Sequence, residues 1–139
     1  MTTASHDQAL CLEVLDFEDA DHWRWRLTDA AGKYLASHEV SLDPAEAEYA
    51  AFENLDRYLK NHAAPDKEHQ DEARLLEEVG AWIARRVFGA IATRLASVPT
   101  PATVRVFLPE KAAFLLERPL ELAHVRGRPL SLQDISLVH

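Results

Sequence analysis

The chain carries seven histidines, and two of them lie at a spacing that metal chemistry can use. His62 and His69 fall in a polar stretch, seven positions apart, which would bring both side chains to one side of a helix. A zinc site needs further ligands, and no second histidine pair or set of carboxylates completes one at the usual spacing. The sequence therefore predicts no metal site and no cofactor.

Cys11 is the single cysteine, so it forms no disulfide within the chain, and a reducing compartment suits it. A cysteine acts as a nucleophile when a neighbouring base or cation favours its thiolate, and the local sequence supplies neither. Free cysteine is among the residue types most often buried, so a buried place on a strand is the simpler interpretation. No Gly-rich phosphate loop and no distinctive carboxylate pair is present. We predict no catalytic residue in this chain.

Aromatic and basic residues interleave at Trp23, Arg24, Trp25 and Arg26, as they do on nucleic-acid-binding platforms. In a strand, however, this alternation puts the tryptophans on one face and the arginines on the other. The net charge of −8 opposes binding to phosphates and to an anionic membrane surface. We therefore expect the tryptophans in the core, and neither nucleic acid nor membrane as a partner.

The elements that position these residues begin with three strands. Alternating apolar residues predict strands at 9–17, 23–27 and 34–42, joined in an antiparallel meander with a tight turn at Gly32. In the first strand, Leu10, Leu12 and Val14 share one face. Its other face carries Cys11, Leu15 and Phe17.

Two helices follow the meander. Asp43 suits the N-cap of the first, with Pro44 at its first position and Glu46 completing a capping box, and the helix extends to about residue 61. After a polar linker at 62–70, the helical period of apolar residues predicts one long helix over 71–97. Gly80 and Gly89 weaken that helix, so we expect close packing against a neighbour at both positions.

The carboxyl-terminal part returns to strands. The pattern at 103–108 predicts an inner strand buried on both faces, and 109–116 is expected to form a short helix. A turn follows at 126–129, and 130–138 is expected to form a final strand. Hydrophobic residues make up 47% of the 139 positions, which is enough for one domain with a core of its own. We predict an α+β domain over 1–139, divided into 1–61, the linker 62–70, and 71–139. No signal peptide or membrane span is evident, so we expect a cytoplasmic protein.

The carboxyl-terminal pattern resembles a known family. A strand at 104–109 (VRVFLP), a short helix, the segment 116–122 (LERPLEL), a turn at Gly127 and the strand 130–138 (LSLQDISLV) are similar to the opening of the CHAT peptidases. These are caspase-like, clan CD cysteine peptidases. The Trp-Arg-Leu strand, the Asp-Ala-Ala-Gly turn and the two helices extend this resemblance upstream to about Trp23.

The resemblance implies a caspase-like α/β sheet after the two helices, and it places the catalytic histidine and cysteine of the family downstream of the matched region. Neither His139 nor Cys11 takes those roles. The family's Pro-Trp-Glu-Leu element corresponds to Pro119, Leu120, Glu121 and Leu122, with leucine in place of tryptophan. There we expect Glu121 to be a buried or strand-edge acid that bonds backbone groups.

Two functions follow as hypotheses. In the first, the chain is the non-catalytic amino-terminal part of a CHAT-type peptidase, which completes the fold and contacts the catalytic part. The apolar strand at 130–138, with one residue after it, motivates this expectation. In the second, the chain is a free-standing interaction module, dimeric through its exposed strand edges and without enzymatic activity. A hydrolase in its own right is the weakest reading.

Overall fold

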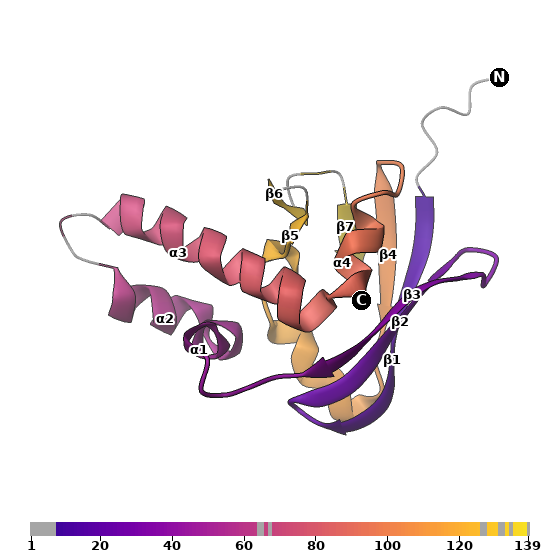
Figure 1. The fold of residues 1–139 in the computed structure, drawn as a ribbon, viewed down its shortest axis with the longest axis horizontal. Helices are drawn as coiled ribbons and strands as arrows, with labels where there is room; N and C mark the ends of the chain where they lie inside the picture. The colour runs from indigo at the N-terminus through magenta and orange to yellow at the C-terminus, as the bar shows by residue number, and fades with distance from the viewer. Residues whose placement is uncertain are drawn as a thin grey trace.

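One mixed β-sheet organises the protein, and the helices lie on one side of it (Figure 1). The computed structural model describes residues 8–63, 66, 68–125, 128–130, 133 and 135–138. Helices and strands are both abundant, and the predicted α+β class is confirmed. No helix in these described ranges combines the length and the hydrophobicity needed to cross a membrane.

The sheet has an antiparallel half and a parallel half that meet at β1. Its strand order is β3-β2-β1-β4-β7. β1 pairs antiparallel with β2, and β2 with β3, which confirms the predicted meander. On the other side of β1, β4 and then β7 run parallel to it. The strands are β1 Gln8–Asp19, β2 His22–Asp29, β3 Tyr34–Ser41, β4 Ala102–Phe107 and β7 Ile135–Val138.

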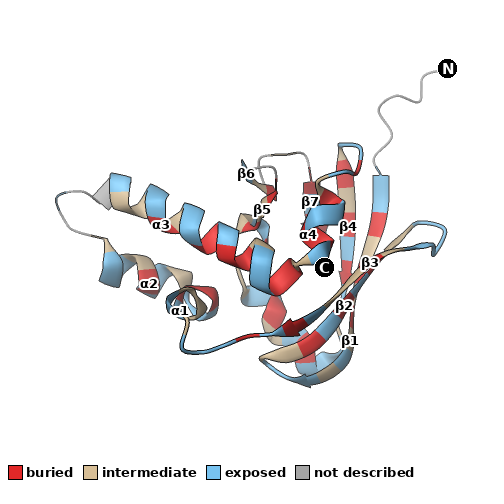
Figure 2. Ribbon diagram, in the orientation of Figure 1, coloured by how far each residue is buried: buried red, intermediate tan, exposed pale blue. Residues whose placement is uncertain are grey.

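Burial alternates along each strand, so the core lies on the helix side of the sheet alone (Figure 2). Trp23 and Trp25 are buried while Arg24 and Arg26 are exposed, as the sequence predicted. The expectation that the strand at 103–108 is buried on both faces is wrong. Val104 and Val106 are buried, but Arg105 and Phe107 are exposed, because no described element packs on their side of the sheet.

Phe17 lies on the core side of β1, against the prediction that it shares a face with Cys11 and Leu15. Asp16 adopts a left-handed backbone conformation, with φ of 49°, and the β1–β2 register is irregular at this point. Such a bulge shifts the alternation of side chains by one position. The Phe17 ring then packs against Phe114, with 6.1 Å between the ring centroids, and Phe114 also contacts Trp23.

The predicted first helix begins later and is divided into two. α1 spans Ala47–Glu53 and α2 spans Leu55–His62. Asp43 accepts a hydrogen bond from the backbone N–H of Ala45 and starts a turn rather than capping a helix. The Glu46 carboxylate accepts bonds from Trp82 Nε1 (3.3 Å) and Arg86 Nη2 (3.2 Å), so the predicted capping box does not form. Asn54 separates the two helices and caps α2 with its side chain.

The predicted long helix is interrupted. α3 spans Glu68–Trp82, so it starts inside the predicted linker 62–70, of which residues 64, 65 and 67 lie outside the described ranges. A π-helical segment, η2 (Ile83–Phe88), follows, and α4 spans Ala90–Leu95. Gly89, with φ of 50°, makes the break. The close packing expected at both glycines is confirmed: a Cβ at Gly80 would collide with the His124 ring, and one at Gly89 with the His38 ring.

The segment between β4 and β7 is mostly 3₁₀-helical. The predicted short helix is present as η3 (Glu110–Glu117), and η4 (Leu120–Leu122) follows. A small hairpin pairs β5 (His124–Val125) with β6 (Arg128–Pro129) around the predicted turn, whose residues 126 and 127 lie outside the described ranges. The predicted strand at 130–138 is realised only from Ile135, with 131, 132 and 134 also outside those ranges.

Candidate interaction surface

The side of the sheet opposite the helices, here called the open face, is covered by no described element (Figure 1). It gathers polar and apolar side chains from all five strands of the main sheet. Because the strands pair in a defined register, these side chains form rows across the sheet. The open face comprises Cys11, Glu13, Leu15, Asp16, Arg24, Arg26, Thr28, Ser37, Glu39, Thr103, Arg105, Phe107, Ser136 and Val138.

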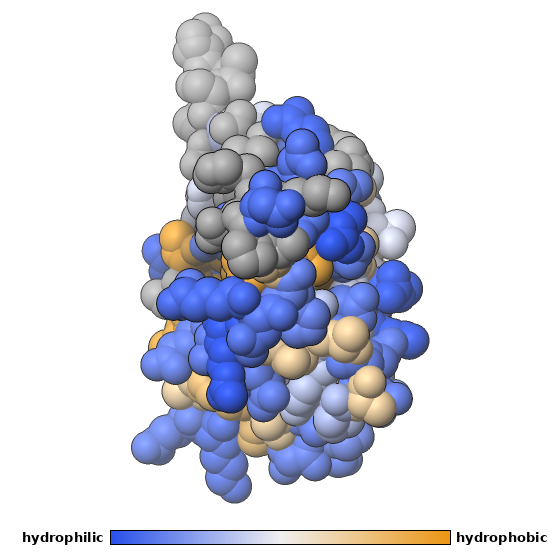
Figure 3. Space-filling model, turned by 90° about the vertical axis from the view of Figure 1, so that its left-hand side faces the viewer, coloured by the Kyte–Doolittle hydropathy of each residue, from blue (hydrophilic) through white to orange (hydrophobic). Residues whose placement is uncertain are grey.

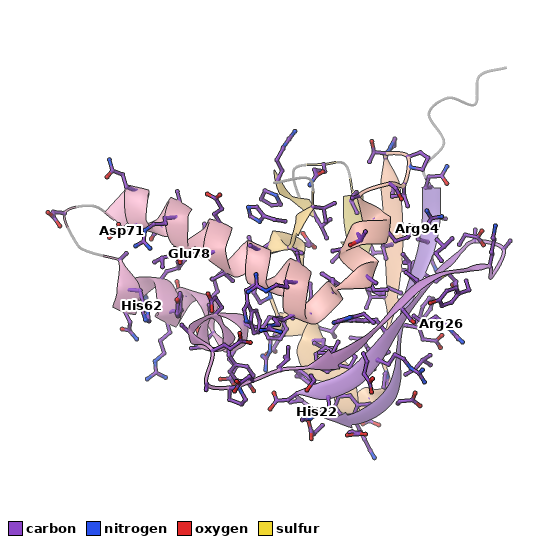
Figure 4. All side chains as sticks on the ribbon, viewed as in Figure 1. His22, Arg26, His62, Asp71, Glu78 and Arg94 are labelled. Carbon is purple, nitrogen blue, oxygen red and sulfur yellow. The ribbon has the colours of Figure 1, made fainter. Side chains whose placement is uncertain are left out.

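The antiparallel half of the open face is charged and internally paired. Glu13 lies directly opposite Arg26, and Arg26 Nη2 donates to Glu13 Oε1 at 2.6 Å. Arg24 forms a second ion pair with Asp16 at the bulge. Arg26 projects from the sheet away from the helices (Figure 4). These cross-strand pairs suit contact with water, since exposed ion pairs retain much of their hydration.

The parallel half has a different chemistry. Phe107 and Val138 are 49% and 40% exposed, which is unusual for large apolar side chains in strands. Arg105 lies between Cys11 on β1 and Val138 on β7, and it makes no hydrogen bond or ion pair with any described residue. Arg105, Phe107 and Val138 line a shallow hollow of about 350 Å³. This half therefore offers apolar contact and one unpaired cation.

The outer edge of β7 extends this surface. Among the described residues, β7 pairs with β4 alone, so its other edge carries no strand. A strand edge of this kind presents backbone N–H and C=O groups that another strand can pair with. By contrast, the face at the free ends of α2 and α3 is mainly hydrophilic, with scattered apolar atoms (Figure 3).

The Pro119–Leu122 segment lies beside β7. Leu120 is buried at 2% exposure, whereas Glu121 is exposed and η4 is a 3₁₀ turn. The prediction of a buried or strand-edge glutamate is therefore wrong, because the turn directs Leu120 into the core and Glu121 to the surface. The segment lines a groove of about 310 Å³ together with Leu116 and Leu137.

A hollow of about 700 Å³ lies beside the turn between β1 and β2, and His22 is one of the residues that line it. His22 Nδ1 and Asp19 Oδ1 are 2.8 Å apart. Their hydrogen bond raises the pKa of His22 and lowers the pKa of Asp19, and both side chains are partly exposed to solvent. In the part of the chain that the structure describes, no three His, Cys, Asp or Glu side chains are grouped as metal ligands. Cys11 is half-buried on the open face, away from this pair.

These features define an α+β domain whose main sheet is covered by helices on one face and by no described element on the other. No protein-family model, curated protein or solved structure matches the chain. The open face was missed at the sequence level, whereas an exposed strand edge was expected. The charged Arg105 between the apolar Val104 and Val106 was the available signal.

Proposed function

We propose that this chain is the non-catalytic amino-terminal part of a CHAT-type, caspase-like cysteine peptidase, and that the catalytic part packs on the parallel half of its open face and on the β7 edge. The observation that carries the proposal is the uncovered parallel half. Parallel strands are normally covered on both faces, and here no described element covers one face of β4 and β7.

Coverage of this half would contribute substantial free energy. Phe107 and Val138 keep 49% and 40% of their surface exposed, so covering the rest should contribute about half of the roughly 1.5–3 kcal/mol that full burial of such a side chain gives. An added strand on β7 would satisfy the backbone groups of its outer edge at the same time. The chain then acts by completing the sheet and by placing the catalytic part, whose own residues supply the histidine and the cysteine. The proposed setting is the cytoplasm, where the thiol of Cys11 stays reduced.

A second candidate function is a free-standing module that dimerises through the same surface. The balance of charges favours it: the open face has Arg24, Arg26 and Arg105 against Glu13, Asp16 and Glu39. A surface with both signs in equal number can be complementary to itself in a two-fold dimer. Both candidates use the open face and differ in what covers it.

Cys11 provides the test, because it is the only cysteine of the chain and lies on β1, where the two halves meet, directly beside Arg105 of the parallel half. The chain is prepared alone and joined to the region that follows it in its natural reading frame. The rate of Cys11 alkylation by a maleimide is then measured by peptide mass mapping. We expect rapid modification in the isolated chain and strong protection in the longer protein.

The matched control moves the thiol to the opposite edge of the open face, in a Cys11→Ser, Ser37→Cys variant, which should react equally in both forms. Equal reactivity of Cys11 in both forms overturns the proposal, as does a reading frame without a histidine and a cysteine after core strands. Protection that grows with the concentration of the isolated chain, with a dimer in sedimentation analysis, favours the dimeric module instead.

A further inference from the structure

Arg118, immediately before the Pro119–Leu122 segment, is held in place by aromatic rings. Its guanidinium carbon lies 5.0 Å from the ring centroid of Phe114 and 5.7 Å from that of Phe52. The backbone is also fixed, since Arg118 N–H donates to the Leu115 carbonyl and its own carbonyl accepts from Leu120 N–H. Stacking of this kind restricts the guanidinium plane and leaves its edges free to donate hydrogen bonds.

These hydrogen-bond donors have no partner among the described residues. Arg118 Nε is buried and unbonded, and no described carboxylate lies within ion-pair distance of the guanidinium. Buried arginine N–H groups nearly always have an acceptor, because desolvation without one is costly. Because Nε is buried, an incoming carboxylate would bond to the Nη donors. The oriented guanidinium, which has no acceptor among the described residues, is suited to receive it there in the bidentate manner typical of arginine.

Arg118 stands at the junction of two surface grooves. One, of about 480 Å³, runs from α1 and α2 to Arg118, and the other, of about 310 Å³, continues from Arg118 along η4 to Leu137 of β7. The two share Leu116, Arg118 and Pro119. Leu116 is 50% exposed, so it offers an apolar contact at the junction. The combined length suits a short peptide segment better than a small ion.

The charges around the grooves favour one kind of occupant. Glu53, Asp56 and Glu117 line the first groove, and Arg118 is its single cation. These acids favour an occupant that carries a cation beside its anion, which a free phosphate does not. We infer that the groove binds a segment of a partner protein that presents a Glu or Asp to Arg118, an apolar side chain to Leu116, and a Lys or Arg to the acids on α1 and α2. This inference holds for a partner of any family and does not rest on the proposed function.

The test uses the full chain, labelled with ¹⁵N, and two probe peptides: acetyl-Leu-Glu-Leu-Lys-amide and the same peptide with Gln in place of Glu. We expect saturable shifts of the Arg118 Nε–H resonance and of the Leu120 amide with the Glu peptide. The Gln peptide should bind on the order of tenfold more weakly, because it lacks the charge-assisted bonds.

Two variants separate binding from folding. Arg118→Gln should abolish the preference for the Glu peptide, and Leu116→Ser, at an exposed position that the fold tolerates, should weaken both peptides. Arg105→Gln removes an arginine on the open face and should change nothing. Absence of saturable shifts, equal binding of the two peptides, or an equal loss in Arg105→Gln overturns the inference and leaves Arg118 as a cation stacked for structural reasons alone.

Discussion

The two halves of the open face differ at positions that the sheet makes equivalent. Glu13 on β1 faces Arg26 on its antiparallel side and Phe107 on its parallel side. Cys11 likewise faces Thr28 on one side and Arg105 on the other. The antiparallel half pairs Glu13 with Arg26 across strands, whereas the parallel half exposes apolar side chains and Arg105, which has no acceptor among the described residues. The two sides of β1 therefore differ in surface chemistry: one is charged and the other is partly apolar.

On the covered face of the same sheet, side chains are buried much more deeply than on the open face. Several large side chains on it are fully buried, among them Leu12 and Trp25, whereas Phe107 keeps about half of its surface in water. Side chains from η2, α4 and η3 fill the space above β1, β2 and β3 on that side. Substitutions on the two faces should therefore differ sharply in cost.

The largest effect is expected on the covered face. Leu12→Ala should lower the free energy of unfolding by about 2–5 kcal/mol, because it leaves a cavity under the helices. Phe107→Ser, on the parallel half of the open face, should change it by no more than about 0.5 kcal/mol in the isolated chain. Urea denaturation of both variants measures this. A Phe107→Ser cost equal to that of Leu12→Ala would mean that the parallel half is already covered in the isolated chain.

A smaller effect is expected where the antiparallel half is tied to the helices. The Tyr49 hydroxyl of α1 donates to Asp21 Oδ1, at the β1–β2 turn, at 2.5 Å. Tyr49→Phe should cost about 1 kcal/mol in urea denaturation at neutral pH. Asp21→Asn, which keeps an acceptor at this position, should lower the free energy of unfolding by less. If Tyr49→Phe leaves the free energy of unfolding unchanged, the turn is held by other contacts.

The same residue predicts a pH dependence. Burial, together with the bond to the Asp21 carboxylate, raises the pKa of Tyr49 to about 12 from an ordinary 10.0. The folded protein therefore holds this proton more tightly than the unfolded chain, and stability falls as the pH rises from 10 to 12. Thermal unfolding across this range should show a shallower alkaline loss in Tyr49→Phe than in the unmodified chain. Identical slopes would contradict the assignment.

The smallest effect concerns the ion pairs of the antiparallel half. A double-mutant cycle with Glu13→Gln and Arg26→Gln should give a coupling of about 0.2–1 kcal/mol that decreases with added salt. Arg105→Gln serves as the matched control on the parallel half and should leave the isolated chain unchanged. A loss in Arg105→Gln as large as in Arg26→Gln would remove the distinction between the two halves.

Much of the local structure was predictable. The three-strand meander, the buried tryptophans, the short helix after β4 and the tight packing at Gly80 follow from periodicity and residue type, although that helix is of the 3₁₀ type. The helix boundaries were harder to predict. The cap predicted at Asp43 failed because Glu46 bonds Trp82 and Arg86, and that preference arises from residues far away in the sequence.

The candidate surfaces were mostly hidden from the sequence. Alternation in β4 distinguishes two sides of a strand but does not say which of them another element covers, so Phe107 was assigned to a core. The Arg118 site depends on Phe52 and Phe114 meeting from separate helices, and no local pattern marks that meeting.

The sequence by itself determined most element types and the inward face of most of β1 and β2, because the period of apolar residues sets these. The tertiary structure decided that β4 and β7 join the meander in one sheet, that the described helices pack on one side of it, that the rings of His38 and His124 fill the space beside Gly89 and Gly80, and that Arg105 and Arg118 have no acceptor among the described residues. These properties depend on which elements meet, and the free energy of their packing is distributed over contacts between distant parts of the chain.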